Sequence, residues 1–179
     1  MIKALTQIRE NKLVKDLLLV LGASIFLGLS GPLNIPLPFT PIPLALRQIL
    51  VPLLGIFLGP RRAALAVVAF IFQGVIGLPV FMGAGLFGPM AGYLVGYVAA
   101  AYISGKIAEK SHTYKNHFFA LSMGSLSIYL FGIVGLMPYV GSLQKAIFLG
   151  VAPFILGDLL KIILATKVSQ FRANLFSDL

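Results

Sequence analysis

Asp158 and Lys161 are the residues whose types and spacing are best suited to chemistry in this sequence. They interrupt the apolar run PFILGDLLKIILATK, from Pro153 to Lys167. Residues three apart on a helix share a face, so the two side chains can contact each other or hold a ligand between them. An acid beside a base offers an acceptor and a donor to a neutral polar group such as an amide or urea. The alternative is a structural ion pair, which apolar residues could replace at little cost.

Further polar and aromatic residues could complete a binding site around this pair. Arg47, followed by Gln48, either faces inward to meet an anionic group of a solute or extends its side chain to the outer headgroups. Gln73 is a second polar residue in an apolar run, where a hydrogen bond between helices is the alternative to ligand binding. Aromatic residues next to irregular segments could cover a ligand. The predicted substrate-binding residues are Asp158, Lys161, Arg47, Gln48, Gln73, Tyr93, Phe39, Thr40 and Phe81.

Composition identifies the elements that must position these side chains. Of the 179 residues, 59% are hydrophobic and only 11% are charged, which indicates an integral membrane protein with one domain over residues 1–179. The sequence has no cysteine, which excludes disulfides and thiolate metal sites. The polar N-terminal segment 1–16 differs from a cleaved signal peptide, so we expect it to be retained.

Six apolar windows are long enough to be transmembrane helices, which need about 20 mostly apolar residues. Between them, GPRR at 59–62 predicts a tight turn, and the segments 31–43 and 77–89 are too rich in proline and glycine to be regular helix. The sequence therefore predicts an all-α bundle of six transmembrane helices. The predicted windows are residues 17–33, 44–59, 63–80, 90–107, 118–136 and 146–167.

Lysine and arginine predict the orientation of this bundle, since they gather in cytoplasmic loops. Lys145 is the one basic residue in the loops of the opposite side. We therefore expect both termini in the cytoplasm, and the net charge of +9 is explained by topology and anionic lipid without nucleic acid. His112 and His117 are expected on a solvated face without a metal. The basic residues assigned to the cytoplasmic side are Lys3, Arg9, Lys12, Lys15, Arg61, Arg62, Lys106, Lys110, Lys115 and Arg172.

Small residues at intervals of four form a ridge in the fourth window. A shorter version, Ser24 and Gly28, occurs in the first window. Such ridges let helices approach closely, either within one chain or with a docked membrane protein. The ridge consists of Gly92, Gly96, Ala100 and Ser104. The positions predicted for partner docking are Gly92, Gly96, Ser24 and Gly28.

Five motifs in the same order give this chain a family resemblance. They are PLPFTPIP at 36–43, LGPRRAALAV at 58–67, GLPVF at 77–81, GPMAGYLVGY at 88–97 and PFILGDLLK at 153–161. Together they resemble the BioY family, the biotin-specific substrate-binding (S) subunits of energy-coupling factor (ECF) transporters.

The resemblance implies a six-helix subunit of a prokaryotic cytoplasmic (inner) membrane that binds biotin near the outer face and carries it inward. Its implied partners are a transmembrane coupling subunit and two ATPase subunits, with no cofactor and no metal in the chain itself. It places the polar pair on Asp158 and Lys161. We expect Asp158 to accept from the ureido N–H groups of biotin and Lys161 to donate to the ureido oxygen.

The chain departs from the family pattern at Arg47, Met90 and Ala91, and Arg47 could contact the biotin carboxylate. Three alternatives stay open: an S subunit for another small vitamin, a solitary carrier, and an intramembrane enzyme using Asp158 and Lys161. The predicted helices lack a cysteine, a histidine and a second carboxylate, which disfavours the enzyme.

Overall fold

Seven α-helices make up the described part of the chain. The computed structural model describes residues 12–31, 35, 37–81 and 88–177. Lys3 and Arg9, which were used to predict the orientation, lie outside these residues. The helices are α2 (Lys12–Leu29), α3 (Arg47–Leu58), α4 (Pro60–Val75), α5 (Ala91–Ala108), α6 (Tyr114–Val140), α7 (Leu143–Gly150) and α8 (Ile155–Ser177), with the short 3₁₀ helix η2 (Pro79–Phe81).

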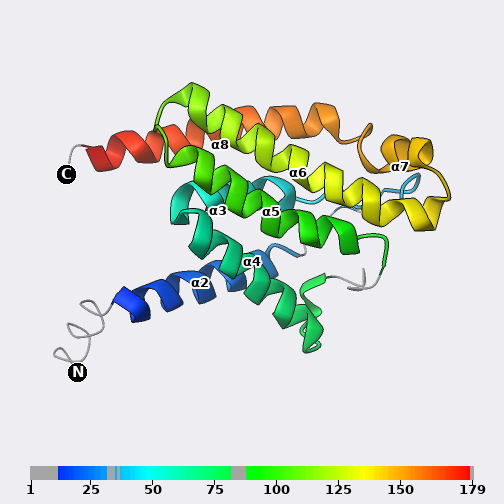
Figure 1. The fold of residues 1–179 in the computed structure, drawn as a ribbon, viewed down its shortest axis with the longest axis horizontal. Coiled ribbons are helices and arrows are strands. Elements are labelled where there is room, and N and C mark those ends of the chain that lie inside the picture. Colours follow the sequence, from blue (N-terminus) through cyan, green and yellow to red (C-terminus); the bar gives the residue numbers. More distant parts are fainter. Residues whose placement is uncertain (1–11, 32–34, 36, 82–87, 178–179) are drawn as a thin grey trace.

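Helix α5 lies at the centre of the bundle. It packs against α3, α4 and α6, while α2 packs on α4 and α8 lies against α3 and α6. Figure 1 shows α6 and α8 along one side of the molecule and α2 on the opposite side. The core between them contains large apolar side chains, including Phe70, Leu94, Tyr97, Ile128 and Leu136.

The first five predicted windows each overlap one helix, with shifted bounds. Helix α3 starts at Arg47 instead of residue 44, because Leu44 pairs with Ile35 in an isolated antiparallel bridge. Helix α4 starts at Pro60, and proline is favoured in the first turn because no helical partner is needed for its missing N–H. It ends at Val75, close to Gly77, whose φ of +91° is left-handed and suits glycine.

The sixth predicted window is not one helix. It is divided between α7 and α8, which are bent by 50° at residues 151–154. Pro153 lies in this break, and proline cannot donate the backbone hydrogen bond that a continuous helix needs. The break makes Ile155 the first residue of a new helix and places Asp158 in its first turn.

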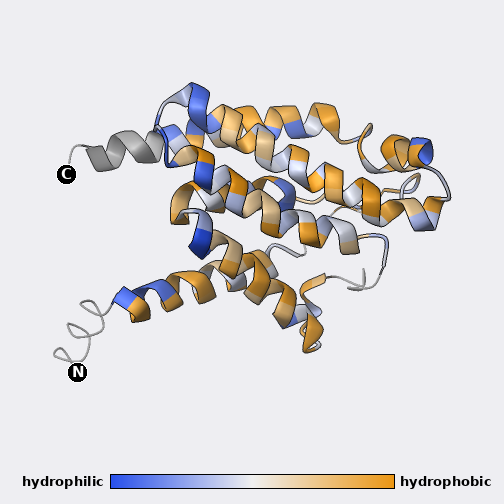
Figure 2. Cartoon of the chain, viewed as in Figure 1, coloured by the Kyte–Doolittle hydropathy of each residue, from blue (hydrophilic) through white to orange (hydrophobic). Residues whose placement is uncertain are grey.

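Two parts of the described chain have the length and composition of a membrane span. Helix α6 is one, and α7 with α8 is the other only if the bent pair counts as a single span. The predicted six spans and the orientation of the termini therefore stay predictions. The surface is strongly apolar: Leu156 is 83% exposed and Leu29 is 74% exposed. Figure 2 shows hydrophobic residues along all of the helices. An apolar surface of this extent is typical of contact with lipid.

The small-residue ridge of α5 packs against α6. A Cβ atom on Gly92 would lie 2.3 Å from the Phe131 carbonyl oxygen, and one on Gly96 would lie 2.9 Å from the Ile128 Cα. These approaches are too close for any side chain, so glycine permits the contact. The ridge therefore packs within the chain.

The shorter ridge of α2 also packs within the chain. The Ser24 hydroxyl accepts a hydrogen bond from Gln73 of α4, and a Cβ on Gly28 would lie 3.1 Å from Val80 Cγ1 in η2. A partner at either ridge would have to displace these contacts, so partner docking stays a prediction.

His117 is buried, and the prediction that it lies on a solvated face is wrong. It is 1% exposed, and its Nδ1 lies 2.9 Å from both Ser169 Oγ and Gln170 Nε2 of α8. Helix α6 starts at Tyr114, after Thr113 caps it, and so begins a turn earlier than the predicted residue 118. The earlier start brings His117 onto the face that packs against α8. His112, which precedes the helix, is exposed as predicted.

Candidate functional site

Asp158 is buried at the point where the broken helix restarts. It is 4% exposed, and its backbone N–H donates to Phe154 O at 2.8 Å. The first turn of a helix carries a partial positive charge from its free N–H groups, which stabilises a carboxylate there. The break between α7 and α8 therefore gives Asp158 a favourable position that a continuous helix would not provide.

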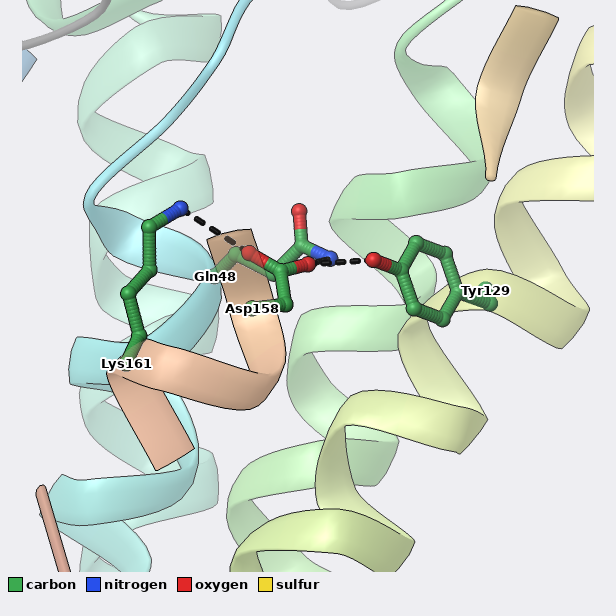
Figure 3. A network of polar contacts seen from close by, with 4 residues as sticks. All are labelled: Gln48, Tyr129, Asp158 and Lys161. Carbon is green, nitrogen blue, oxygen red and sulfur yellow. Dashed lines mark hydrogen bonds and ion pairs between the residues drawn. The ribbon is translucent and has the colours of Figure 1, made fainter. Parts of the chain in front are cut away.

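Three side chains from three helices donate to the Asp158 carboxylate. Lys161 Nζ of α8 lies 2.9 Å from Oδ1, as the spacing of the two residues predicts. Gln48 Nε2 of α3 and the Tyr129 hydroxyl of α6 both donate to Oδ2. Figure 3 shows the carboxylate between Lys161 on one side and Tyr129 on the other, with Gln48 beside it.

The arrangement suits a neutral polar ligand. The charges of Asp158 and Lys161 compensate each other, so a neutral ligand brings no uncompensated charge into the site. The side chain of Lys161 is 21% exposed while that of Asp158 is 6% exposed, so the amine is the more accessible of the two. An amide or urea could take a hydrogen bond from the amine and donate one to the carboxylate.

Arg47 is the second buried charge, and it does not extend to the surface. It is 3% exposed, and its Nε donates to the Leu27 carbonyl oxygen at 3.0 Å and to Ser30 Oγ at 3.1 Å. Its Nη2 donates to the Val80 carbonyl oxygen at 2.6 Å, and the guanidinium lies 4.8 Å from the ring centre of Phe70. The inward orientation agrees with one of the two predicted alternatives. A contact with an anionic group of a ligand stays a prediction.

Gln73 contacts α2 and Phe81 contacts Phe70, and Arg47 also contacts both α2 and Phe70. Gln73 Nε2 donates to Ser24 Oγ at 2.9 Å, which is the hydrogen bond between helices that was the alternative to ligand binding. The Phe81 ring packs edge to face against the Phe70 ring, with 5.3 Å between the ring centres. The Arg47 guanidinium lies over the same Phe70 ring. The two predicted residues therefore support the region around Arg47.

Tyr93 and Thr40 bind the last residues of α7. The Tyr93 hydroxyl donates to the Gly150 carbonyl oxygen at 2.9 Å, and the Thr40 hydroxyl donates to the Leu149 carbonyl oxygen at 2.7 Å. These two bonds connect α5 and the segment before α3 to the end of α7. Phe39, beside Thr40, is 59% exposed. The structure therefore brings Gln48, of all the further predicted residues, into the network of Asp158 and Lys161.

Tyr129 is the member of this network that the sequence analysis missed. It lies in an apolar stretch, SLSIYLFG at 125–132, near the middle of the predicted window 118–136. A tyrosine hydroxyl in the middle of an apolar helix needs a hydrogen-bond partner, and this need is the sequence feature that indicates a polar contact at Tyr129. The signal does not identify the partner, because Tyr129 and Asp158 are 29 residues apart.

Comparison with known proteins gives matches over most of the chain. The model of the BioY family matches residues 2–177. The biotin transporter BioY of Thermotoga maritima is 35% identical over 140 residues, covering 75% of this chain and 83% of that protein. The biotin transporter BioY of Rhodobacter capsulatus is 34% identical over 180 residues, covering 88% of this chain and 94% of that protein.

A solved structure shares the fold. The crystal structure of the S-component for biotin from an ECF-type ABC transporter matches with a TM-score of 0.81 and 24% sequence identity. The match covers 92% of this chain and 94% of the solved chain.

Proposed function

The chain belongs to the BioY family, and from this premise we propose that it captures biotin at the outer face of a membrane and carries it inward. The relatives named above are biotin transporters, which supports both the substrate and the process. The family is one of membrane transporters, in agreement with the apolar surface of the bundle. The membrane is proposed to be the cytoplasmic membrane of a prokaryote.

The proposed assembly is an ECF-type transporter in which this chain is the substrate-binding subunit. Its partners would be a transmembrane coupling subunit and two ATPase subunits, within the lipid bilayer. The sequence has no GxxxxGK[ST] phosphate-binding motif, so ATP would be hydrolysed by other chains. Uptake of labelled biotin by cells with and without the ATPase subunits tests this point, since a solitary carrier would work without them.

The observation that carries the proposed function is the carboxylate of Asp158, held beside the Lys161 amine by three helices. Biotin has a neutral ureido ring with one carbonyl oxygen and two N–H groups. Lys161 would donate to the oxygen, and Asp158 would accept from an N–H group. The more accessible amine would be reached first by the ligand.

Calorimetric titration of the purified full chain with biotin, and with an analogue whose ureido ring is altered, tests this site. We expect tight binding of biotin and weak binding of the analogue. Asp158→Asn and Lys161→Ala should each weaken the binding of biotin. Tight binding that survives both substitutions would contradict the site, and absence of biotin binding by folded protein would contradict the substrate. Tight binding of a different vitamin would favour that alternative.

Six spans with both termini in the cytoplasm are proposed for the bundle. The basic residues on one predicted side and the apolar outer surface of the helices support this topology. Because the sequence has no cysteine, single substitutions Lys145→Cys and Lys110→Cys provide matched labelling sites. An impermeant thiol reagent added to intact cells should label the first and spare the second. The reverse pattern would overturn the orientation.

A further inference from the structure

We propose that Gln48 is a specificity-determining residue whose carbonyl oxygen Oε1 accepts a hydrogen bond from one ureido N–H of the substrate. Tyr129 and the Nε2 group of Gln48 have a different role, which is to position Asp158. This inference rests on the proposed function, and it assigns a role to each atom that surrounds the carboxylate.

The need for a second acceptor follows from the chemistry of the ureido ring. The ring presents one carbonyl oxygen and two N–H groups, so complete pairing takes one donor and two acceptors. Lys161 supplies the donor, and Asp158 supplies one acceptor. A buried N–H that is left without a partner weakens binding, because its hydrogen bond to water has been lost.

Asp158 has room to accept one N–H group. A carboxylate offers about four acceptor positions on its two oxygens. Gln48 Nε2 and the Tyr129 hydroxyl take two of them at Oδ2, and Lys161 Nζ takes one at Oδ1. A single position therefore remains, on Oδ1. The second ureido N–H requires another acceptor.

The orientation of the Gln48 amide provides that acceptor. Its Nε2 must face the carboxylate, because a flipped amide would place two acceptor oxygens against each other. Oε1 therefore points away from Asp158, and Figure 3 shows it above the carboxylate, between the Lys161 amine and the Tyr129 hydroxyl. No hydrogen bond to Oε1 is found within the described residues. Oε1 is also absent from their fully buried unpaired polar atoms.

Tyr129 offers the matched control. Its hydroxyl donates to the same Oδ2 atom as Gln48 Nε2, and Tyr129→Phe removes that donor while leaving Gln48 Oε1 in place. Gln48→Met removes both the donor to Oδ2 and the Oε1 acceptor at similar side-chain length. The two variants therefore separate an effect on Asp158 from a contact with the ligand.

The test is titration of the full chain in detergent with biotin and two cyclic carbamate analogues, in each of which oxygen replaces one ureido N–H. In the wild type both carbamates should bind at least about 10-fold more weakly than biotin. Gln48→Met should weaken biotin by about 10- to 100-fold, but should weaken one of the two carbamates only by the factor that the loss of one donor to Oδ2 causes, as measured with Tyr129→Phe. Tyr129→Phe should weaken all three ligands by a common factor.

Several outcomes would overturn the role of Gln48. One is a Gln48→Met variant that weakens all three ligands equally, as Tyr129→Phe does, because Gln48 would then act only through Asp158. Another is unchanged biotin binding by that variant. If Gln48→Met does not fold, Gln48→Asn replaces it. The shorter side chain moves the amide away from both Asp158 and the ligand, so the same three ligands can be compared. In the wild type, a carbamate that binds as tightly as biotin would also overturn the role. Absence of biotin binding by the wild type would contradict the proposed function instead.

Discussion

Arg47 and Asp158 are both buried charges, but the molecule satisfies them in different ways. Arg47 is 3% exposed and Asp158 is 4% exposed. Arg47 donates mainly to backbone carbonyl groups, at the end of α2 and in η2. Asp158 accepts from three side chains. Backbone groups inside helices move only with the fold, whereas side chains change rotamer and can exchange one partner for another.

The difference indicates two functions for buried charge in one bundle. The guanidinium of Arg47 connects α3 to α2 and η2, so we interpret it as part of the scaffold. The carboxylate of Asp158 lies among groups that can reorient toward a solute. A buried ionisable residue in a membrane protein is a candidate functional residue by default. Both residues meet that criterion, but side chains hold the carboxylate of Asp158 whereas mainly backbone groups hold the guanidinium of Arg47, so the functional role is assigned to Asp158.

The largest effect on stability is expected for Arg47→Met. This change leaves the Leu27 and Val80 carbonyl groups without their charged donor, and hydrogen bonds to charged groups contribute about 1.5–3 kcal/mol each. We expect the free energy of unfolding to fall by about 3 kcal/mol, measured by denaturation in mixed micelles. Arg61→Met, at an exposed position, is the control and should change it by less than about 0.5 kcal/mol. An unchanged stability for Arg47→Met would remove the distinction between the two regions.

A smaller effect on stability is expected for Lys161→Met. Asp158 keeps the donors Gln48 and Tyr129, and the lysine side chain is partly exposed. We expect a loss of about 1 kcal/mol in the free energy of unfolding, since the buried carboxylate keeps two donors and only the partly exposed partner is removed. The same micelle denaturation measures it. A loss as large as that of Arg47→Met would mean that the Asp158 network is also scaffold.

The smallest effect is expected for the hydrogen bond between Gln73 and Ser24, which supports the neighbourhood of Arg47. Interhelical hydrogen bonds in membrane proteins contribute about 0.6 kcal/mol on average. A double-mutant cycle with Gln73→Leu and Ser24→Ala should therefore give a coupling energy near that value. Coupling above about 2 kcal/mol would show that α2 depends on this bond to α4 as much as on the guanidinium of Arg47.

The sequence predicted the helices better than it predicted their ends. Apolar windows located α2 to α6, because composition alone marks a long buried or lipid-facing segment. The start of α3 depends on the pairing of Leu44 with Ile35, a contact outside the helix itself. Pro153 lies at the break between α7 and α8. Proline is also tolerated inside membrane helices, so its presence in the sequence does not distinguish a broken helix from a continuous one.

In the candidate site too, the sequence predicted the contact within one helix but not the contacts between helices. The contact between Asp158 and Lys161 follows from the sequence, because residues three apart on a helix meet through local geometry. His117 was misplaced because its burial depends on the packing of α6 against α8. Gln48 was named as a site residue, but its donor role toward Asp158 was not foreseen.

The amino-acid sequence by itself determined an apolar helical chain with an acid and a base on one helix face. The tertiary structure decided what surrounds that pair. Gln48 lies 110 residues from Asp158 in sequence, and Tyr129 lies 29 residues away. Contacts within one helix are set by its 3.6-residue period, which any reader of the sequence can apply. Contacts between helices depend on how α3, α6 and α8 cross, and those crossings arise from the packing of the whole bundle.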